Sequence, residues 1–246
     1  MEKIFGLHAV TAALRSGREC QRLWLQDNRR DTRLNEIETR AQKLGVDVER
    51  VARQELDRIA ADTHHQGAVG EFGAPVGPDN LEDLLDTLTE PAFLLVLDGV
   101  QDPHNLGACL RTADAAGVHA VIAPKDRACG VTPTVRKVAA GAAETVPFFA
   151  VTNIARTLKD LKDRGVWLAG TAGEADQTIY GLDLTGAIAI VMGAEGEGLR
   201  RLTRESCDWL AKLPMSGQVE SLNVSVAAGI CLFEAVRQRT ASSGRK

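Results

Sequence analysis

The sequence has few aromatic residues, no paired cysteine motif and no long hydrophobic run, and each absence excludes a class of protein. Aromatic residues make up 4% of the 246 residues, so an aliphatic core is expected. The five cysteines are odd in number and scattered, and they never form a CxxC pair. This argues against a disulfide framework or a zinc ribbon and favours a reducing compartment. No stretch reaches the roughly 18 apolar residues of a membrane span, and the N-terminus lacks the order of a signal peptide. We therefore expect a cytoplasmic protein with no membrane partner.

The sequence also lacks a large excess of charge of either sign. The formal net charge is -4, so no bulk positive field indicates a nucleic-acid partner, although a locally basic face remains possible. Hydrophobic residues at 44% and charged residues at 25% are the ordinary balance of a globular protein with enough apolar material for a core. The length fits one large domain or two small ones.

Two regions of the chain differ in residue composition and hydrophobic pattern. Residues 2–72 are Arg-rich with mixed charge, and they predict a small α/β domain over residues 1–72. Its expected elements are a strand at 22–25, a helix at 33–44 that ends at Gly45, a strand at 46–51 and a helix at 54–61. Residues 73–80 hold two prolines and two glycines, so we expect a linker over 73–90 and a second domain over 91–246.

The second domain alternates continuous apolar runs with helical patterns. The runs lie at 93–97, 120–123, 166–170 and 187–191, and the helical patterns at 106–116, 134–143, 153–164 and 223–239. Strands that are apolar throughout are typical of a parallel sheet covered on both faces. Alternation of strand and helix therefore predicts an α/β domain with a parallel sheet.

Ligands of an open parallel sheet bind beyond the carboxyl ends of its strands, and the first unusual segment at such an end is 98–111. Asn105 is a plausible N-cap of the following helix, and Arg111 lies nearly two turns further on. A capped helix with one exposed arginine would also account for this segment.

Two further segments are unusual. Residues 192–199 read MGAEGEGL, whose glycine spacing differs from the GxGxxG of a dinucleotide fold; a plain glycine turn is the alternative. Residues 213–227 place Ser221, a candidate N-cap, with Asn223 and Ser225 at the start of an otherwise apolar helix. Capping would use only one of these three residues, which indicates a ligand or a subunit contact.

Together the three segments resemble the three motifs of the SpoU (TrmH-type) 2'-O-ribose RNA methyltransferases of the SPOUT class. The pattern is Asn then Arg in the first, GAEGEGL in the second, and LPM followed by SLNVSVA in the third. FGLHAV at residues 5–10 and HQG at 65–67 resemble the ends of a small substrate-binding domain of one bacterial subgroup. The resemblance implies a parallel-sheet SPOUT catalytic domain with a C-terminal trefoil knot, preceded by a small α/β RNA substrate-binding domain.

The resemblance also implies site residues and a cofactor. The active-site residues of the family map to Asn105, Arg111, Glu195, Ser221 and Asn223. The S-adenosylmethionine positions map to Gly193, Leu213 and Leu222, with Thr171 a weaker candidate. Methyl transfer from a sulfonium needs no metal, so none is expected. At Gly193 we expect that a side chain would block the adenosine.

The implied reaction is methylation of a ribose 2'-hydroxyl. The phrases GVHAVIAPKDR and GTAGEADQTIYGLDLTG are similar to those of family members that methylate a guanosine in the peptidyl-transferase loop of 23S ribosomal RNA. Alternatives are a methyltransferase acting on transfer RNA or another ribosomal position, and a non-catalytic relative that binds ribosomal RNA. Family members form homodimers through the catalytic domain, and Val224, Ala227 and Ala228 are the expected contact face.

For other charged residues, the sequence leaves open whether they contact RNA or belong to an ordinary solvated surface. Lys125, Asp126 and Arg127 follow an apolar run and could contact RNA or form a surface ion pair. His64 and His65 are expected in a solvated loop. Phosphate contacts in the first domain could come from Arg15, Arg18, Arg22, Arg29, Arg30 and Arg33, provided that they cluster on one face.

Overall fold

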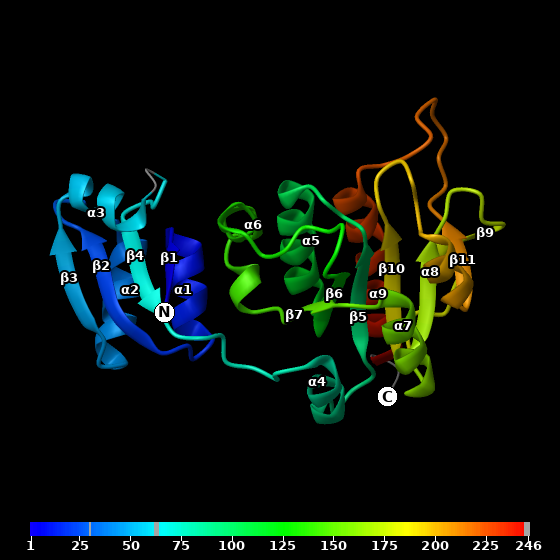
Figure 1. The fold of residues 1–246 in the computed structure, drawn as a ribbon, viewed down its shortest axis with the longest axis horizontal. Helices are drawn as coiled ribbons and strands as arrows, with labels where there is room; N and C mark the ends of the chain where they lie inside the picture. Colours follow the sequence, from blue (N-terminus) through cyan, green and yellow to red (C-terminus); the bar gives the residue numbers. More distant parts are fainter. Residues whose placement is uncertain (30, 62–63, 244–246) are drawn as a thin grey trace. The chain divides into compact units, whose positions relative to one another are not determined.

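The computed structural model describes residues 1–29, 31–61 and 64–243 and divides the chain into two compact units (Figure 1). Unit 1 comprises Met1–Gly77 together with Ala140–Thr145, and unit 2 comprises Pro78–Ala139 and Val146–Lys246. Arg30 lies outside the described residues. The predicted linker, 73–90, contains helix α4 (Leu81–Thr87), whose Leu81 and Leu84 are buried in the core of unit 2.

Unit 1 is built on a mixed four-stranded sheet in the order β1-β4-β2-β3. Its elements are β1 (Glu2–Phe5), α1 (Leu7–Arg15), β2 (Cys20–Gln26), α2 (Thr32–Lys43), β3 (Asp47–Val51), α3 (Arg53–Ala60) and β4 (Ala68–Phe72). β2 is parallel to β3 and antiparallel to β4. The predicted elements at 22–25, 33–44, 46–51 and 54–61 are confirmed. Gly45 follows α2 with a left-handed φ of 71°, as a glycine after a helix end often does.

Two buried polar side chains hold unit 1 together. The Arg18 side chain is 1% exposed; its Nε donates to the Gly73 carbonyl at 3.0 Å, and its guanidinium pairs with Glu2 and Glu144. His65 is also buried, so the expectation of a solvated loop is wrong for this residue. The reason is that both ring nitrogens have partners: Nδ1 accepts from the Gly67 N–H and Nε2 lies 3.0 Å from Asp57 Oδ1.

Unit 2 is built on a seven-stranded sheet in the order β7-β6-β5-β10-β8-β11-β9, in which every recorded pairing is parallel. Its strands are β5 (Phe93–Asp98), β6 (Ala120–Pro124), β7 (Phe148–Val151), β8 (Trp167–Thr171), β9 (Gln177–Thr178), β10 (Ile188–Gly193) and β11 (Trp209–Lys212). The four predicted apolar strands are β5, β6, β8 and β10, which confirms the parallel α/β domain. β7, β9 and β11 were not predicted.

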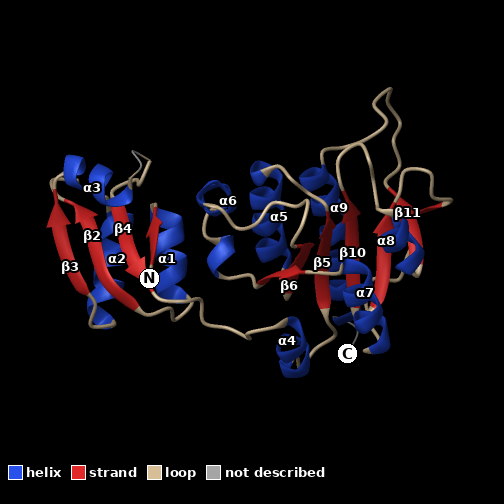
Figure 2. Cartoon of the chain, in the orientation of Figure 1, coloured by secondary structure: helices blue, strands red, loops and turns tan. Residues whose placement is uncertain are grey.

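Helices cover both faces of this sheet (Figure 2). The helices of unit 2 are α4, α5 (Pro103–Ala116), α6 (Pro133–Ala139), α7 (Ile154–Asp163), α8 (Arg201–Ser206) and α9 (Val224–Ser243), with short 3-10 turns at Ile179–Gly181 in unit 2 and Ala142–Glu144 in unit 1. None of the helices in the described part of the chain combines the length and the apolar character that a membrane span requires.

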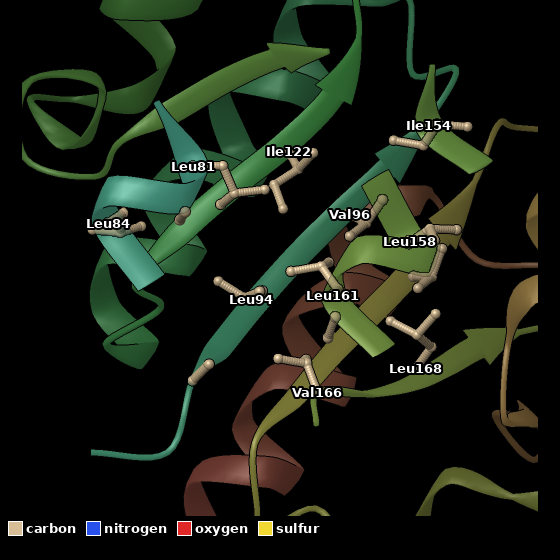
Figure 3. Close-up of a cluster of buried hydrophobic side chains, with 14 residues drawn as sticks. Leu81, Leu84, Leu94, Val96, Ile122, Ile154, Leu158, Leu161, Val166 and Leu168 are labelled. Carbon is tan, nitrogen blue, oxygen red and sulfur yellow. The ribbon is translucent and has the colours of Figure 1, made fainter. Parts of the chain in front are cut away.

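The core of unit 2 is aliphatic, as the scarcity of aromatic residues predicts. Figure 3 shows Leu158 and Leu161 of α7 packed over Leu94 and Val96 of β5, with α9 on the far side of the sheet. These side chains are almost completely buried. Each buried aliphatic side chain contributes about 1.5–3 kcal/mol through the area it removes from water, so the sheet is a rigid base for the loops at its edge. The trefoil knot stays a prediction.

Candidate active site

The three unusual segments begin at the same edge of the unit 2 sheet. β5 ends at Asp98, β10 at Gly193 and β11 at Lys212. β10 lies beside β5, and β11 is separated from β10 only by β8, with all pairings parallel. Parallel strands present their carboxyl ends at one edge, so the loops that follow these strands start close together.

Asn105 lies inside α5 and is not its N-cap. The cap is Asp102, whose Oδ1 accepts from the His104 N–H at 2.9 Å, and Pro103 occupies the first helical position. Proline suits that position because its missing N–H would have no helical partner there. The expectation of Asn105 as the cap is therefore wrong, and its side chain is available for another contact.

That contact is a hydrogen-bonded cluster of three side chains from three distant segments. Asn105 Nδ2 donates to Glu195 Oε1 at 2.8 Å. Asn223 Nδ2 donates to Asn105 Oδ1 at 2.9 Å and to the same Glu195 oxygen at 3.0 Å. Each segment therefore supplies one member of what we call the polar cluster, Asn105, Glu195 and Asn223.

Asn223 also starts the last helix. Its Oδ1 accepts from the Ser225 N–H at 2.9 Å and from the Ser225 hydroxyl at 2.6 Å. These two donors fix the amide orientation, so that Nδ2 faces Asn105 and Glu195. The expectation of Ser221 as the N-cap is wrong, because Asn223 bonds the first-turn N–H and α9 begins at Val224.

The glycines of the second segment shape a tight loop that presents Glu195. The Ala194 N–H donates to the Gly198 carbonyl at 3.1 Å, and the Gly198 N–H donates back at 3.0 Å. A Cβ on Gly193 would lie 2.1 Å from the Gly198 carbonyl carbon. This clash within the loop is a structural reason for glycine at 193, beside the expected exclusion of a side chain from adenosine.

An ion pair of buried Asp98 with the partly exposed Arg200 joins the loops that follow β5 and β10. Asp98 is completely buried at the end of β5, and its Oδ2 accepts from the Arg200 N–H at 3.1 Å. Its Oδ1 makes no hydrogen bond with any described residue and lies 3.5 Å from Arg200 Nη1. Sequence reasoning missed this pair, although a carboxylate directly after the apolar run 93–97 was a usable signal.

The other predicted site residues are not members of the cluster. Arg111 on α5 and Ser221 before α9 are exposed, and no hydrogen bond between described residues links either to the cluster. Leu213 is half-buried after β11 and Leu222 is exposed. Thr171, at the end of β8, donates its hydroxyl to the Val191 carbonyl at 3.3 Å.

Burial disfavours the thiolate of Cys109, a cysteine close to Asn105 in the sequence. Cys109 lies one turn after Asn105 on α5, and burial, together with the negative charge of Glu195, raises the pKa of this thiol to about 12. A thiolate is therefore scarce near neutral pH.

Family models match both parts of the chain. The SpoU rRNA Methylase family matches residues 92–233, and the model described as RNA 2'-O ribose methyltransferase substrate binding matches residues 3–75. The first match includes all three segments of the candidate site and the whole polar cluster.

Curated relatives are similar over nearly the full length. The 23S rRNA (guanosine-2'-O-)-methyltransferase RlmB of Ralstonia nicotianae is 58% identical over 96% of this chain and 96% of that protein. The protein of the same name from Pseudomonas aeruginosa is 56% identical over 97% of each chain.

Solved structures share the fold. The SpoU methyltransferase AviRb of Streptomyces viridochromogenes, in complex with AdoMet, has a TM-score of 0.81 at 24% identity and covers 97% of this chain and 90% of its own, a likeness that concerns the fold. The AdoMet-bound rRNA methyltransferase of Sinorhizobium meliloti has a TM-score of 0.75 at 27% identity, covering 96% of this chain and 86% of its own. From the family model over residues 92–233 and relatives more than half identical along nearly all of its length, this chain belongs to the SpoU rRNA methylase family.

Proposed function

We propose that this chain transfers a methyl group from S-adenosylmethionine to the ribose 2'-hydroxyl of a guanosine in 23S ribosomal RNA, in its peptidyl-transferase loop. The names of the relatives at 58% and 56% identity support the reaction and the RNA. The observation that carries the proposal is the polar cluster, because Asn105, Glu195 and Asn223 come from the three motif-like segments and meet in one hydrogen-bonded group.

The loops around the cluster fit the proposed cofactor. Residues 214–222 make no recorded hydrogen bond to another described segment, so their main-chain groups are free to bind a ligand. The same stretch exposes apolar side chains, with Met215 39% and Leu222 37% exposed. Apolar walls with a few main-chain donors and acceptors suit an adenine ring and an aliphatic methionine chain. We propose Gly193, Leu213 and Leu222 as the residues that hold it, with Thr171 nearby.

The residues of the chain must make the 2'-hydroxyl nucleophilic and hold it in line. The sulfonium of S-adenosylmethionine carries the methyl group on a good leaving group, so the transfer needs no metal. A guanidinium stays protonated near neutral pH and is a poor base. Arg111 is therefore proposed to hold the adjacent phosphate and to stabilise the negative charge that develops on the 2'-oxygen.

The polar cluster is proposed to orient the ribose. Glu195 Oε1 accepts from Asn105 and Asn223, and no described residue donates to its Oε2, which leaves that oxygen to accept from the 2'-hydroxyl. Ser221, exposed two residues before Asn223, is proposed to contact the RNA at the same edge.

The test is incubation of the full chain with radiolabelled S-adenosylmethionine and deproteinised 23S rRNA, followed by nuclease digestion and mapping of the labelled nucleoside. We expect label in 2'-O-methylguanosine at one position of the peptidyl-transferase loop. Transfer RNA and 16S rRNA serve as matched substrates. Label in transfer RNA, or elsewhere in ribosomal RNA, would support the first alternative. Binding of 23S rRNA without label in any RNA would identify a non-catalytic relative.

We also propose a homodimer and a division of labour between domains. The predicted contact face needs correction, because Val224 and Ala228 are buried in unit 2 itself. Val226 and Phe233 are exposed instead, 51% and 48%, and lie seven residues apart on one side of α9, where a second copy could cover them. Light scattering that gives a monomer at micromolar concentration would contradict the dimer.

In the proposed division, residues 1–72 hold RNA, 73–90 link, and 91–246 transfer the methyl group. Arg18 is no RNA contact in this scheme, because it is buried. We propose that the reaction takes place in the cytoplasm. The five cysteines are free thiols, which fits a reducing compartment.

A further inference from the structure

Two sets of exposed cations in unit 2 differ in whether acids neutralise them. Three cations on α7 and α8 are paired with acids one turn away: Arg156 with Asp160, Lys159 with Asp163, and Arg201 with Glu205. Such pairs are typical of a solvated helix surface, where each contributes little to stability. A second class, Lys125, Arg127 and Lys137 in the segment between β6 and the end of α6, has no such partner among the described residues.

This second class lies in residues 125–137, which we call the cationic segment. Lys125, Arg127 and Lys137 are exposed, and none of them forms an ion pair with another residue of the described chain. Counting Arg136 as well, the segment has four cations and one acid, Asp126, for a net formal charge of +3 (4 − 1). The whole chain has a net charge of -4, so this concentration runs against the overall balance.

The cationic segment is attached to the candidate site on both sides of Asn105. Before that residue, the Cys129 N–H donates to the Val100 carbonyl at 2.8 Å. After it, α6 packs so closely on α5 that a Cβ on Gly107 would lie 2.6 Å from Val138 Cβ and 2.9 Å from the Val135 carbonyl oxygen. Figure 1 shows α6 beside α5. The segment is therefore held next to the first turns of the helix that carries Asn105 and Arg111.

The backbone at Arg127 is also unusual. Its φ is +56°, in the left-handed region that residues with a side chain seldom adopt outside Asn and Asp. Conformations of this kind persist where surrounding structure holds them, and they are concentrated at binding and catalytic sites. The Cys129 bond to Val100 supplies that constraint two residues away.

Unpaired cations fixed beside a site fit a polyanion. RNA carries one phosphate per nucleotide, and phosphate contacts from Lys and Arg set the register of a bound strand without reading its sequence. We propose that the cationic segment binds phosphates of the RNA strand that flanks the methylated nucleotide. This inference rests on the proposed function, since an RNA substrate at the polar cluster provides the strand.

The experiment compares two triple variants of the full chain that remove the same charge. The test variant is Lys125→Gln, Arg127→Asn and Lys137→Gln; Asn at 127 tolerates the left-handed backbone. The control variant is Arg156→Gln, Lys159→Gln and Arg201→Gln, which removes three exposed but ion-paired cations. Filter binding of deproteinised 23S rRNA is measured from 50 to 300 mM KCl, with S-adenosylhomocysteine affinity measured by calorimetry.

We expect the affinity of the test variant for RNA to fall about 10-fold or more at low salt. The slope of log K against log salt should decrease by about 2, since each lost phosphate contact to a single strand contributes about 0.7. The control variant should keep the wild-type slope. An unchanged affinity for S-adenosylhomocysteine shows that unit 2 is folded, and the charge-preserving variant Lys125→Arg, Arg127→Lys, Lys137→Arg should restore RNA binding.

The outcomes separate this inference from the proposed function. The proposed phosphate binding by the cationic segment is overturned if the test variant keeps the wild-type salt slope, or if the control variant loses as much RNA affinity as the test variant. In either case, methylation of RNA by the wild type would leave the proposed function standing. Failure of the wild type to methylate any RNA refutes the function, and the salt slopes still decide whether the segment binds phosphates.

Discussion

The two units use polar side chains in opposite ways. In unit 1, Arg18 and His65 are buried and bonded to the backbone of their own unit, Arg18 to the Gly73 carbonyl and His65 to the Gly67 N–H. In unit 2, Asn105, Glu195 and Asn223 bond to one another across three segments. Glu195 and Asn223 are exposed while doing so.

The sheets explain this difference. The sheet of unit 1 is mixed, so the carboxyl ends of its strands lie at both edges and no edge collects all the loops. The parallel sheet of unit 2 brings the carboxyl ends of all its strands to one edge. Buried polar groups that bond to the backbone stabilise a fold, whereas side chains that meet at an exposed edge can be completed by a ligand. We therefore expect substitutions of the buried polar residues in unit 1 to lower its stability. Substitutions in the polar cluster of unit 2 should lower activity instead.

The largest expected effect is on the stability of unit 1. Arg18→Ala removes one partner of a buried ion pair, which typically costs about 3–5 kcal/mol, and it also removes the bond to Gly73. Cys20 lies in unit 1 and Cys109 in unit 2, with thiol pKa values raised by burial to about 11 and about 12. In a urea titration with a thiol reagent, Cys20 of the variant should be modified at lower urea, with Cys109 unchanged.

The matched control is Arg15→Ala, an exposed arginine of the same unit, which should change stability by no more than about 0.5 kcal/mol. S-adenosylmethionine affinity should be the same in both variants. Earlier labelling of Cys109 in the Arg18 variant would show that the two units do not differ as described, since the stability of unit 2 would then depend on a contact of unit 1.

The second effect concerns Arg111. Arg111→Lys keeps the charge but removes the planar fork that can hold a phosphate and the 2'-oxygen together. Methyl transfer should fall by about 10²–10³-fold, comparable with the loss of one oxyanion donor, and cofactor affinity by calorimetry should stay the same. Loss of cofactor affinity together with activity would make Arg111 structural, and a rising limb of the pH–rate profile that moves in the Lys variant would identify it as a base.

The sequence predicted those strands whose own residues are apolar throughout. The apolar runs at 93–97 and 187–191 became β5 and β10, because strands covered on both faces must be apolar throughout. β9 and β11 have only two and four residues, and such short strands are defined by their neighbours in the sheet. Their own residues give no signal of comparable strength.

Capping and pairing were harder to predict. Asp102 and Asn105 can both cap a helix; Pro103 favours Asp102, and this signal was present but unused. Asp98 and Arg200 are 102 positions apart, and only the pairing of β5 with β10 brings their loops together. The polar cluster has the same origin, so its members were predictable from the resemblance but their mutual bonds were not.

The smallest expected effect tests the bonds within the polar cluster. Glu195→Ala leaves the amide groups of Asn105 and Asn223 without their shared acceptor, and the loss of hydrogen bonds to a charged group costs about 1.5–3 kcal/mol. The kcat on 23S rRNA should therefore fall about 10–100-fold. Glu195→Gln keeps an oxygen where Oε1 accepts both bonds, and in place of Oε2 it has an amide nitrogen that can donate to the 2'-hydroxyl, so its kcat should fall less than about 10-fold. The matched control is Glu197→Ala, an exposed acid of the same loop, which should keep wild-type kcat.

The ratio between the two Glu195 variants is the decisive quantity, because Gln and Glu have the same shape but differ in charge. If the carboxylate positions its neighbours, Gln rescues most of the rate that Ala loses, and the pH profile of kcat does not change. If it takes the proton from the 2'-hydroxyl, Gln is as inactive as Ala, since a neutral amide cannot accept that proton. The second result would leave the cluster in place but make Glu195 the base of the reaction, and only Asn105 and Asn223 would then be positioning residues.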